Sequence, residues 1–170
     1  MTSADVSDRF GFRDPAILRT FEYWLEKRGQ RRFPARADLD PLDLRYVIGD
    51  VCIIDVARDP RRFSYRLVGT RIVQRDGYDM TGKSLDCLPD AEYREAIRAT
   101  FAKACDRGFP ILGSRDQVID DRIRAYEFLI LPLAANGSDI DMLFTVQRYL
   151  PSVLAASGMT AQIQSRTLEV

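Results

Sequence analysis

Residues Gly77 to Ser84, with the sequence GYDMTGKS, have the spacing of a phosphate-binding loop. They match the pattern G-x-x-x-x-G-K-[ST], in which backbone N–H groups and a lysine hold the phosphates of a nucleotide. Such a loop needs a buried strand before its first glycine and a long helix after its last one. Here residues 70–76 are mostly polar, and Pro89 would stop a helix that begins at Lys83. We therefore keep a nucleotide hydrolase only as the less favoured alternative.

Other catalytic chemistries are restricted by the side chains that the chain lacks. None of the 170 residues is a histidine, which excludes Ser-His-Asp and Cys-His catalysis and histidine-ligated zinc or haem on this chain. The three cysteines, Cys52, Cys87 and Cys105, lie far apart and form no C-x-x-C motif. This sparse set fits a reducing cytoplasm better than a disulfide scaffold. We interpret Cys87 and Cys105 as structural residues rather than redox sites.

Carboxylates remain as acid–base candidates. Asp120 and Asp121 fit a hairpin turn better than a catalytic pair, because aspartate favours turn geometry. Glu127 lies in the middle of an expected strand. Facing outward it would be a solvent or interface residue, and facing inward it would be an acid with a raised pKa. We expect it to face outward, and the sequence as a whole predicts a protein that is not an enzyme.

Composition favours a single domain with a sizeable core. Hydrophobic residues make up 46% of the chain, and 25 basic residues balance 25 acidic ones. This balance gives no electrostatic reason to expect nucleic acid or a membrane surface as a partner. The first residues have no apolar signal segment, and no apolar run approaches 18 residues. We expect a cytoplasmic protein.

The elements that would position a site begin after a flexible N-terminus at residues 1–13. Asp14 and Pro15 predict a helix start, and Gly29 predicts its end. One apolar stripe runs along this helix and consists of Ile17, Leu18, Phe21, Trp24 and Leu25. The stripe either packs on its own domain or pairs with a second copy in a homodimer, and the sequence leaves both alternatives open.

The remaining pattern predicts an α+β domain of five antiparallel strands with helices on one face. A short helix is expected over 42–48 and a long one from Asp90 to Gly108, with short helical pieces around Ile72. Alternating or apolar runs predict strands at 51–56, 63–69, 111–119, 123–133 and 140–150. Asn136 and Gly137 predict a tight turn between the last two strands. Residues 151–170 are expected to form a tail with a last helical segment.

The order of these elements, together with several short motifs, resembles the PAS superfamily. It is most similar to small bacterial single-domain PAS proteins that carry an N-terminal amphipathic helix. The resemblance covers residues 14–150, taken as one domain that includes the N-terminal helices. The matching segments are Tyr23-Trp24, residues 38–43 (DLDPLD), residues 54–56 (IDV) with Pro60, residues 63–70 (FSYRLVGT) and residues 80–85 (MTGKSL).

The resemblance implies the strand order 2-1-5-4-3, a cavity between sheet and helices, and a sensory or protein-interaction role without catalysis. The cofactor stays unknown, because the cysteine motif of the flavin photosensors and the histidine of haem-binding relatives are both absent. We expect a signalling domain that binds a small ligand, a protein partner, or both, and that regulates a separate output protein. The alternative is an interaction adaptor with a filled core and no ligand.

Strand alternation predicts which side chains would face the implied cavity. The candidates are Tyr65, Leu67, Tyr126, Phe128 and Phe144 from the sheet, with Met80 and Phe101 from the helical side. These side chains either line a ligand site or simply fill the core. Arg66 and Arg71 could hold a carboxylate or phosphate of a ligand, and the alternative for each is a surface ion pair. The polar flank of the first helix, which carries Glu22, Glu26, Lys27 and Arg28, could set the choice of a protein partner.

Overall fold

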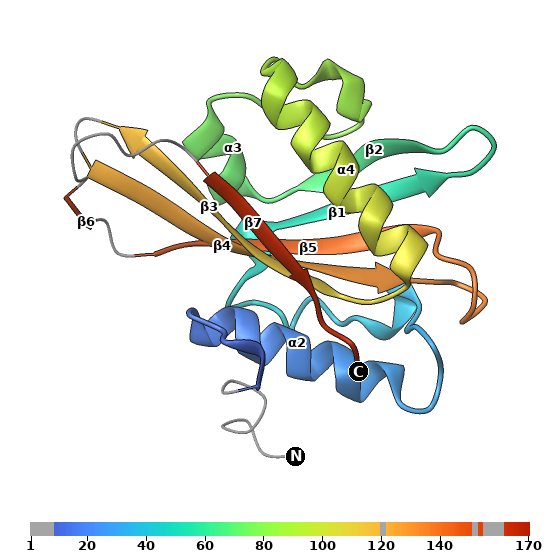
Figure 1. Cartoon of the computed structure of the whole chain (residues 1–170). Coiled ribbons are helices and arrows are strands. Elements are labelled where there is room, and N and C mark those ends of the chain that lie inside the picture. The colour runs from blue at the N-terminus through green and yellow to red at the C-terminus, as the bar shows by residue number, and fades with distance from the viewer. Residues whose placement is uncertain (1–8, 120–121, 151–152, 155–161) are drawn as a thin grey trace.

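The computed structural model describes residues 9–119, 122–150, 153–154 and 162–170. An antiparallel sheet lies between helical segments that cover its two faces (Figure 1). The first long helix packs on one face, and the second long helix crosses the other face. The α+β class is therefore as predicted, but the helices cover both faces rather than one.

The elements have the following bounds. The helices are α2 (Pro15–Arg28), α3 (Thr70–Asp76) and α4 (Ala91–Arg107), and the 3-10 turns are η1 (Arg36–Asp38), η2 (Ile48–Asp50) and η3 (Leu85–Cys87). The strands are β1 (Val51–Ala57), β2 (Arg62–Val68), β3 (Ile111–Ile119), β4 (Arg122–Leu133), β5 (Met142–Tyr149), β6 (Val153–Leu154) and β7 (Gln162–Thr167).

The sheet is larger than the sequence predicts. Its order is β2-β1-β5-β4-β3-β7, and the short β6 also pairs with β4. The first five strands have the predicted order, so the correction lies at the β3 edge. There β7 pairs antiparallel with β3 from Ile111↔Thr167 to Asp116↔Gln162. The expected helical tail is wrong for these residues, because the unpaired edge of β3 offers backbone hydrogen bonds to an extended chain.

Helix α2 begins and ends where its capping residues indicate. The Asp14 carboxylate accepts hydrogen bonds from the backbone N–H groups of Ala16 (2.7 Å) and Ile17 (3.2 Å). At the other end Gly29 has φ 55°, and its N–H donates to the carbonyl of Leu25 over 3.2 Å. Glycine suits this end because a left-handed φ costs it little.

The apolar stripe of α2 packs on the protein's own sheet. Ile17, Phe21 and Trp24 are at most 1% exposed, and the Trp24 indole donates to the carbonyl of Pro132 over 2.9 Å. Leu18 and Leu25 are half-buried against the same core. The first of the two alternatives for this stripe is therefore the one found here. Just before the helix, Phe10 also packs on Phe21, with ring centroids 5.8 Å apart, so residues 9–13 are attached to the core.

The segment between α2 and β1 corrects a second prediction. Residues 41–47 form turns that lead into η2 instead of a helix over 42–48. Leu44 and Val47 are buried, whereas Leu42 and Ile48 are 72% and 49% exposed. Only Leu44 and Val47 are fully buried, with Tyr46 partly buried beside them, and a helix this short gains too little from burial to offset its nucleation cost.

A bulge in β2 changes which face its last side chains meet. Ile54 pairs with Tyr65 and Ile53 with Leu67, which leaves Arg66 as an extra residue. One extra residue inverts the alternation beyond it. Tyr65 therefore faces α4, whereas Leu67 points to the opposite side and is 40% exposed.

Helix α4 also has both predicted ends. Asp90 caps it by accepting a 2.9 Å hydrogen bond from the N–H of Tyr93, and Gly108 ends it with φ 67°. Its buried residues Thr100, Phe101 and Ala104 face the sheet. The predicted turn at Asn136 and Gly137 is also present, with φ 76° at the glycine. The turn expected at residues 120–121 lies outside the described residues.

Candidate functional site

The space between the sheet and α4 is the first candidate site, and aromatic side chains fill it. The sheet contributes Tyr65, Tyr126 and Phe128, and α4 contributes Tyr93 and Phe101. The enclosed volume is about 20 Å³. One water needs roughly 10–15 Å³ measured in this way, so the space holds a single water and no metabolite.

Ring packing closes this interior from several sides. The rings of Tyr126 and Phe128 lie 6.3 Å apart, and Phe101 meets Phe63 edge to face at 5.4 Å. The Tyr126 hydroxyl donates to the Tyr93 hydroxyl over 3.3 Å. Gly113 pairs with Phe128 across the sheet, and a Cβ at this glycine would lie 2.3 Å from the phenyl ring. The sequence therefore makes room for the ring, which in turn occupies the space.

Two arginines cover the polar end of the aromatic cluster. Arg115 lies 4.1 Å above the Tyr93 ring, and Arg75 lies 5.0 Å above the Tyr149 ring. Arg75 also donates to the side chain of Gln147 over 3.1 Å and pairs with Asp76 at 2.7 Å. Cations stacked on aromatic faces in this way are attracted by the ring quadrupole. Arg75 already has these partners and is held in place by them.

Burial keeps the titratable groups of this interior neutral. It raises the pKa of the Cys52 thiol to about 12 and the pKa of both Tyr65 and Tyr93 well above the usual tyrosine value. Removing a group from water disfavours its charged form. The interior therefore offers neither a thiolate nor a phenolate at neutral pH.

The predicted cavity residues separate into two groups. The first group lines the remaining space and consists of Tyr65, Phe101, Tyr126 and Phe128. Met80 belongs to the second group, because it is buried in the core but does not line this space. The others lie away from it: Leu67 is turned out by the bulge, Phe144 is buried on the α2 side, and Arg71 is half-exposed and pairs with Asp50 at 2.9 Å. Arg66 pairs with Asp55 at 2.7 Å, the ion-pair alternative for that residue.

Further lining residues follow from the observed register. Thr145 and Gln147 line the space because they alternate with Phe144, and Cys52 lies on the same face of β1. Tyr93 and Ile97 stand eight and four residues before Phe101 on one helix face, so the helical period already indicated that they belong with it. For β5 the sequence did not show which of the two alternating sets, that of Phe144 or that of Thr145, faces α4.

The geometry at Gly77 to Ser84 is not that of a phosphate-binding loop. Helix α3 precedes Gly77 instead of a strand, and only the three-residue η3 follows Ser84. The N–H of Gly82 donates to the carbonyl of Tyr65 over 2.6 Å, and Lys83 Nζ donates to the carbonyl of Asp79 over 2.7 Å. The segment thus covers the edge of β2, and its donors are used within the protein.

The opposite face of the sheet carries a charged cluster at the start of α2. Arg148 on β5 contacts Asp14 Oδ2 at 3.3 Å and Asp50 Oδ2 at 2.8 Å. Asp14 and Asp50 are 9% and 7% exposed. Asp50 also pairs with Arg71, so two guanidinium groups compensate two buried carboxylates. We call Asp14, Asp50, Arg71, Arg148 and Glu127 the α2-face cluster.

Glu127 belongs to this cluster, and the expectation that it faces outward is wrong. Its side chain is 2% exposed and accepts hydrogen bonds from the N–H groups of Arg13 and Asp14, the shortest at 2.9 Å. Burial raises the pKa of the Glu127 carboxyl, and the two backbone donors oppose that shift. The chain segment before α2 returns over β4 and covers this residue, and the strand pattern alone carries no sign of that contact.

The solvent side of α2 borders a surface groove of about 400 Å³. Glu22 and Glu26, from the predicted partner-selecting flank, line it together with Tyr23, Asp43 and Tyr46. Lys27 pairs with both Glu26 and Asp43 at 3.8 Å. Arg28 turns away and donates to the carbonyl of Val170 over 3.3 Å. Part of the predicted flank thus forms one wall of an open groove.

Comparison with known families supplies the last observation. A family model described as a PAS domain matches residues 12–146. No curated protein matches the chain. Among the described residues, every helix is too short or too polar to cross a membrane.

Proposed function

The chain belongs to the PAS domain family, and from this premise we propose that it regulates a separate output protein through protein contacts, without a ligand in its interior. PAS domains are sensory and signalling modules. The observation that carries the proposal is the filled space under α4, about 20 Å³ in volume. Pockets for small molecules have volumes of roughly 300–1,000 Å³.

The partner surface in this proposal is the groove beside α2. Glu22, Glu26 and Asp43 bring three carboxylates to it, against the guanidinium of Arg19 in its lining and Lys27 Nζ, which lies 3.8 Å from both Glu26 and Asp43. The Tyr23 and Tyr46 hydroxyls hold the two sides together, through Asp40 at 2.8 Å and Thr20 at 3.1 Å. A partner with basic side chains suits these carboxylates, because charge complementarity sets specificity at interfaces.

A link to the interior supports this choice of surface. Helix α2 packs its stripe on β4 and β5, and the same two strands line the space under α4, with Tyr126 and Phe128 on β4 and with Thr145 and Gln147 on β5. A partner that shifts α2 would therefore act on the same two strands. Equally, a state of the domain that alters these strands would change the groove, since a ligand and a conformation bias each other reciprocally.

The experiment compares three versions of the tagged chain expressed in its own cells. The wild type, the double variant Glu22→Lys with Glu26→Lys, and the control Glu92→Lys are isolated, and the associated proteins are quantified. Glu92 is exposed on α4, away from the groove. We expect one set of associated proteins to be lost only from the double variant. Equal recovery from all three would contradict the proposed surface.

Native mass spectrometry of the purified chain tests the interior. We expect the mass of the bare polypeptide. A small molecule that is lost on denaturation and that is excluded by Thr145→Phe, on the lining of the interior, would contradict the ligand-free proposal. It would instead favour the alternative of a small-ligand sensor.

A further inference from the structure

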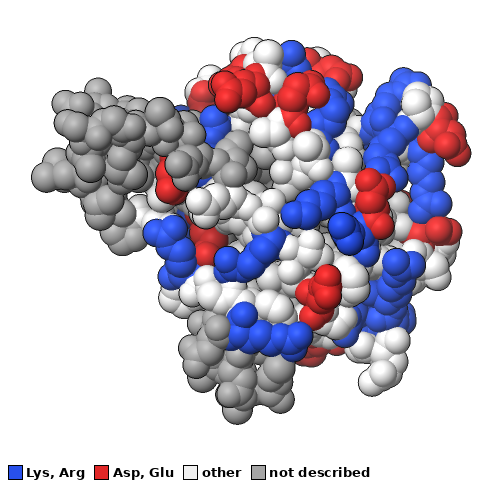
Figure 2. All heavy atoms as spheres, in the orientation of Figure 1, with Lys and Arg blue, Asp and Glu red and all other residues white. Residues whose placement is uncertain are grey.

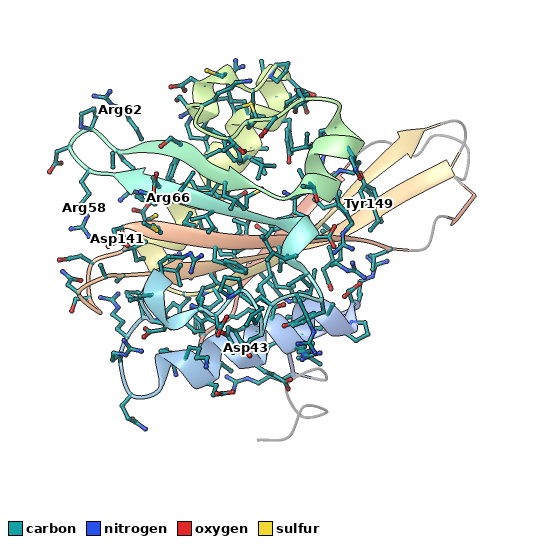
Figure 3. All side chains as sticks on the ribbon, turned by 180° about the vertical axis from the view of Figure 1, so that it is seen from behind. Asp43, Arg58, Arg62, Arg66, Asp141 and Tyr149 are labelled. Carbon is teal, nitrogen blue, oxygen red and sulfur yellow. The ribbon has the colours of Figure 1, made fainter. Side chains whose placement is uncertain are left out.

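A second open groove lies at the end of the sheet, away from the interior site. Its volume is about 420 Å³. It is built where the segment after α2, the β1–β2 turn, the last turn of α4 and the β4–β5 turn meet. Figure 3 shows Arg58, Arg62 and Arg66 on the β1–β2 hairpin, at the same end of the molecule as Asp141. We call this feature the end groove.

The floor of the end groove is apolar. Val56 and Ile140 line it and keep 9% and 8% of their surface open, while Phe33 beside them is covered by Arg32 and is 1% exposed. Cys105 forms part of the wall, and burial raises the pKa of its thiol to about 11. The thiol is therefore protonated at neutral pH and adds a neutral surface. A short hydrocarbon group would find apolar partners on this floor.

The rim of the end groove carries three guanidinium groups. They belong to Arg32, Arg58 and Arg61, and the acidic lining residues are Asp59 and Asp139. Basic side chains also gather at this end of the surface in Figure 2, interspersed with acidic ones. Guanidinium groups present forked donors that match a carboxylate. The groove thus combines an apolar floor with a cationic rim.

Arg58 and Arg61 each have one ion-pair partner and still have guanidinium N–H donors for a ligand. Arg58 contacts Asp139 at 3.2 Å, and Arg61 contacts Asp106 at 2.6 Å. All four side chains are at least 42% exposed, and such exposed pairs contribute only about 0–1 kcal/mol. Each guanidinium has five N–H donors, so one carboxylate contact does not saturate it.

Of the three arginines on the rim, Arg32 is the one without an ion pair among the described residues. Its guanidinium lies 5.1 Å above the Phe33 ring, and none of the described acidic side chains lies within ion-pair distance of it. Its charge does reach Asp139, whose pKa is lowered by Asn136, by Arg58 and also by Arg32. It also lies over Gly108, where a Cβ would meet its terminal nitrogen at 2.6 Å. The stacking holds the charged head at the groove and still leaves the edge of the guanidinium plane to donate.

From this geometry we infer that the end groove binds a small organic carboxylate, with the hydrocarbon part on Val56 and Ile140 and the carboxylate on Arg32. This site is separate from the proposed partner surface and does not depend on it. Arg58 and Arg61 flank the carboxylate and select against neutral ligands. Binding here would give the domain a small-molecule input although its interior is filled.

The test is an NMR titration of the ¹⁵N-labelled full chain with 3-phenylpropionate, and with 3-phenylpropanamide as the neutral control. We expect saturable shifts of the Ser138 and Ile140 amides, and at least about tenfold weaker binding of the amide compound. Equal affinity of the two compounds would overturn the inference, as would the absence of saturable shifts. Shifts centred on the Thr145 amide would place the compound in the interior and overturn the ligand-free proposal as well.

Two matched variants locate the carboxylate. Arg32→Gln removes the rim cation that forms no ion pair, and we expect the affinity for 3-phenylpropionate to fall about tenfold. Arg66→Gln removes another exposed arginine of the β1–β2 hairpin, whose partner is Asp55 outside the groove, and the affinity should stay unchanged. Equal losses in both variants would show general charge attraction and overturn the assignment. The amide spectrum away from the groove reports whether each variant is folded.

Discussion

The two faces of the sheet are closed by different chemistry. Under α4 most contacts are between neutral aromatic rings, with Arg115 stacked on Tyr93 at one end, and the Tyr126 hydroxyl donates a hydrogen bond to the Tyr93 hydroxyl. Under α2 an apolar stripe packs as well, but the start of the helix is attached through the buried charges of Asp14, Asp50 and Arg148. The first face depends on filled volume, and the second depends also on the pairing of charges.

This difference shows how one fold can be rigid on one side and adjustable on the other. A packed aromatic cluster has few alternative arrangements, because native interiors are close to crystalline density. A cluster of charges keeps its geometry only while each member is compensated. Changes of charge near α2 should therefore alter the domain without unfolding it, whereas changes of volume under α4 should act on the whole core.

The largest effect is expected for Phe101→Ala on the α4 face. Phe101 is 4% exposed and packs on Phe63, so the change removes a ring and leaves a cavity. We expect the free energy of unfolding to fall by about 3–5 kcal/mol, measured by urea denaturation. Lys103→Ala on the same helix is the control and should change it by less than about 0.5 kcal/mol. A loss below about 1 kcal/mol for Phe101→Ala would mean that the space is not filled as described.

The next effect is expected for Arg148→Met on the α2 face. Methionine keeps the hydrocarbon stem but leaves Asp14 without its guanidinium partner and Asp50 with Arg71 alone. We expect a loss of about 2 kcal/mol in the free energy of unfolding at pH 7, because hydrogen bonds to charged groups contribute about 1.5–3 kcal/mol.

The control for this prediction is an arginine whose ion pair is more exposed. Arg66→Met breaks the pair with Asp55, in which the arginine side chain is 55% exposed. That change should cost less than about 1 kcal/mol. Similar losses in the two variants would remove the distinction between the buried cluster and an ordinary surface pair.

Local signals in the sequence were sufficient for most of the first five strands and both long helices. Asp14, Gly29, Asp90 and Gly108 mark helix ends, and capping chemistry acts within one turn. The segment over 42–48 failed because its helical pattern was too short to be stabilised by burial. Strand β7 failed because its pairing depends on an edge that only the folded sheet creates.

The candidate site was predictable only in part, for the same reason. Tyr65, Tyr126 and Phe128 were found from alternation, which holds as long as the strand is regular. The extra residue Arg66 shifts the register, and no residue type in β2 announces the bulge. Glu127 is buried by the returning segment before α2, a contact between residues 113 positions apart. Tertiary contacts of this kind leave no periodic trace in the sequence.

Two cysteines at the middle and at the end of the α4 face should differ in reactivity. Cys52 lines the interior and Cys105 lines the end groove, with pKa values of about 12 and about 11. Both thiols are protonated at pH 8, and Cys105 is half-buried whereas Cys52 is buried, so a reagent reaches Cys105 more readily. We expect a thiol reagent to label Cys105 at least about tenfold faster than Cys52 in the native protein.

The exposed Cys87 must be removed from this measurement with Cys87→Ser. The two remaining thiols are then followed by mass spectrometry of peptides, with the denatured chain as the reference for full labelling. Equal rates for Cys52 and Cys105 would show that the interior opens as readily as the groove. Protection of Cys105 alone by 3-phenylpropionate would support the carboxylate site independently of NMR.

The smallest effect is expected for Glu127→Gln, and its value lies in the dependence on pH. Glutamine keeps an acceptor oxygen for the N–H groups of Arg13 and Asp14, so stability at pH 7 should change by no more than about 1 kcal/mol. Burial raises the pKa of the Glu127 carboxyl in the folded protein above its ordinary value of 4.5. The folded state therefore binds the proton more tightly than the unfolded state does.

The sign of the pH dependence follows from this linkage. Below pH 4.5 the group is protonated in both states, and its favourable contribution to folding is complete. As the pH rises, the unfolded chain ionises first, so the wild type loses stability relative to Glu127→Gln until the folded pKa is passed. Urea denaturation of both proteins between pH 3.5 and about 8 measures this difference. The tyrosines and Cys52 of the α4 face should contribute nothing over that range, because burial keeps them neutral. If the stability difference instead grew in favour of the wild type with rising pH, the backbone donors would outweigh burial at Glu127. The N–H groups of Arg13 and Asp14 would then stabilise the ionised carboxylate on the α2 face.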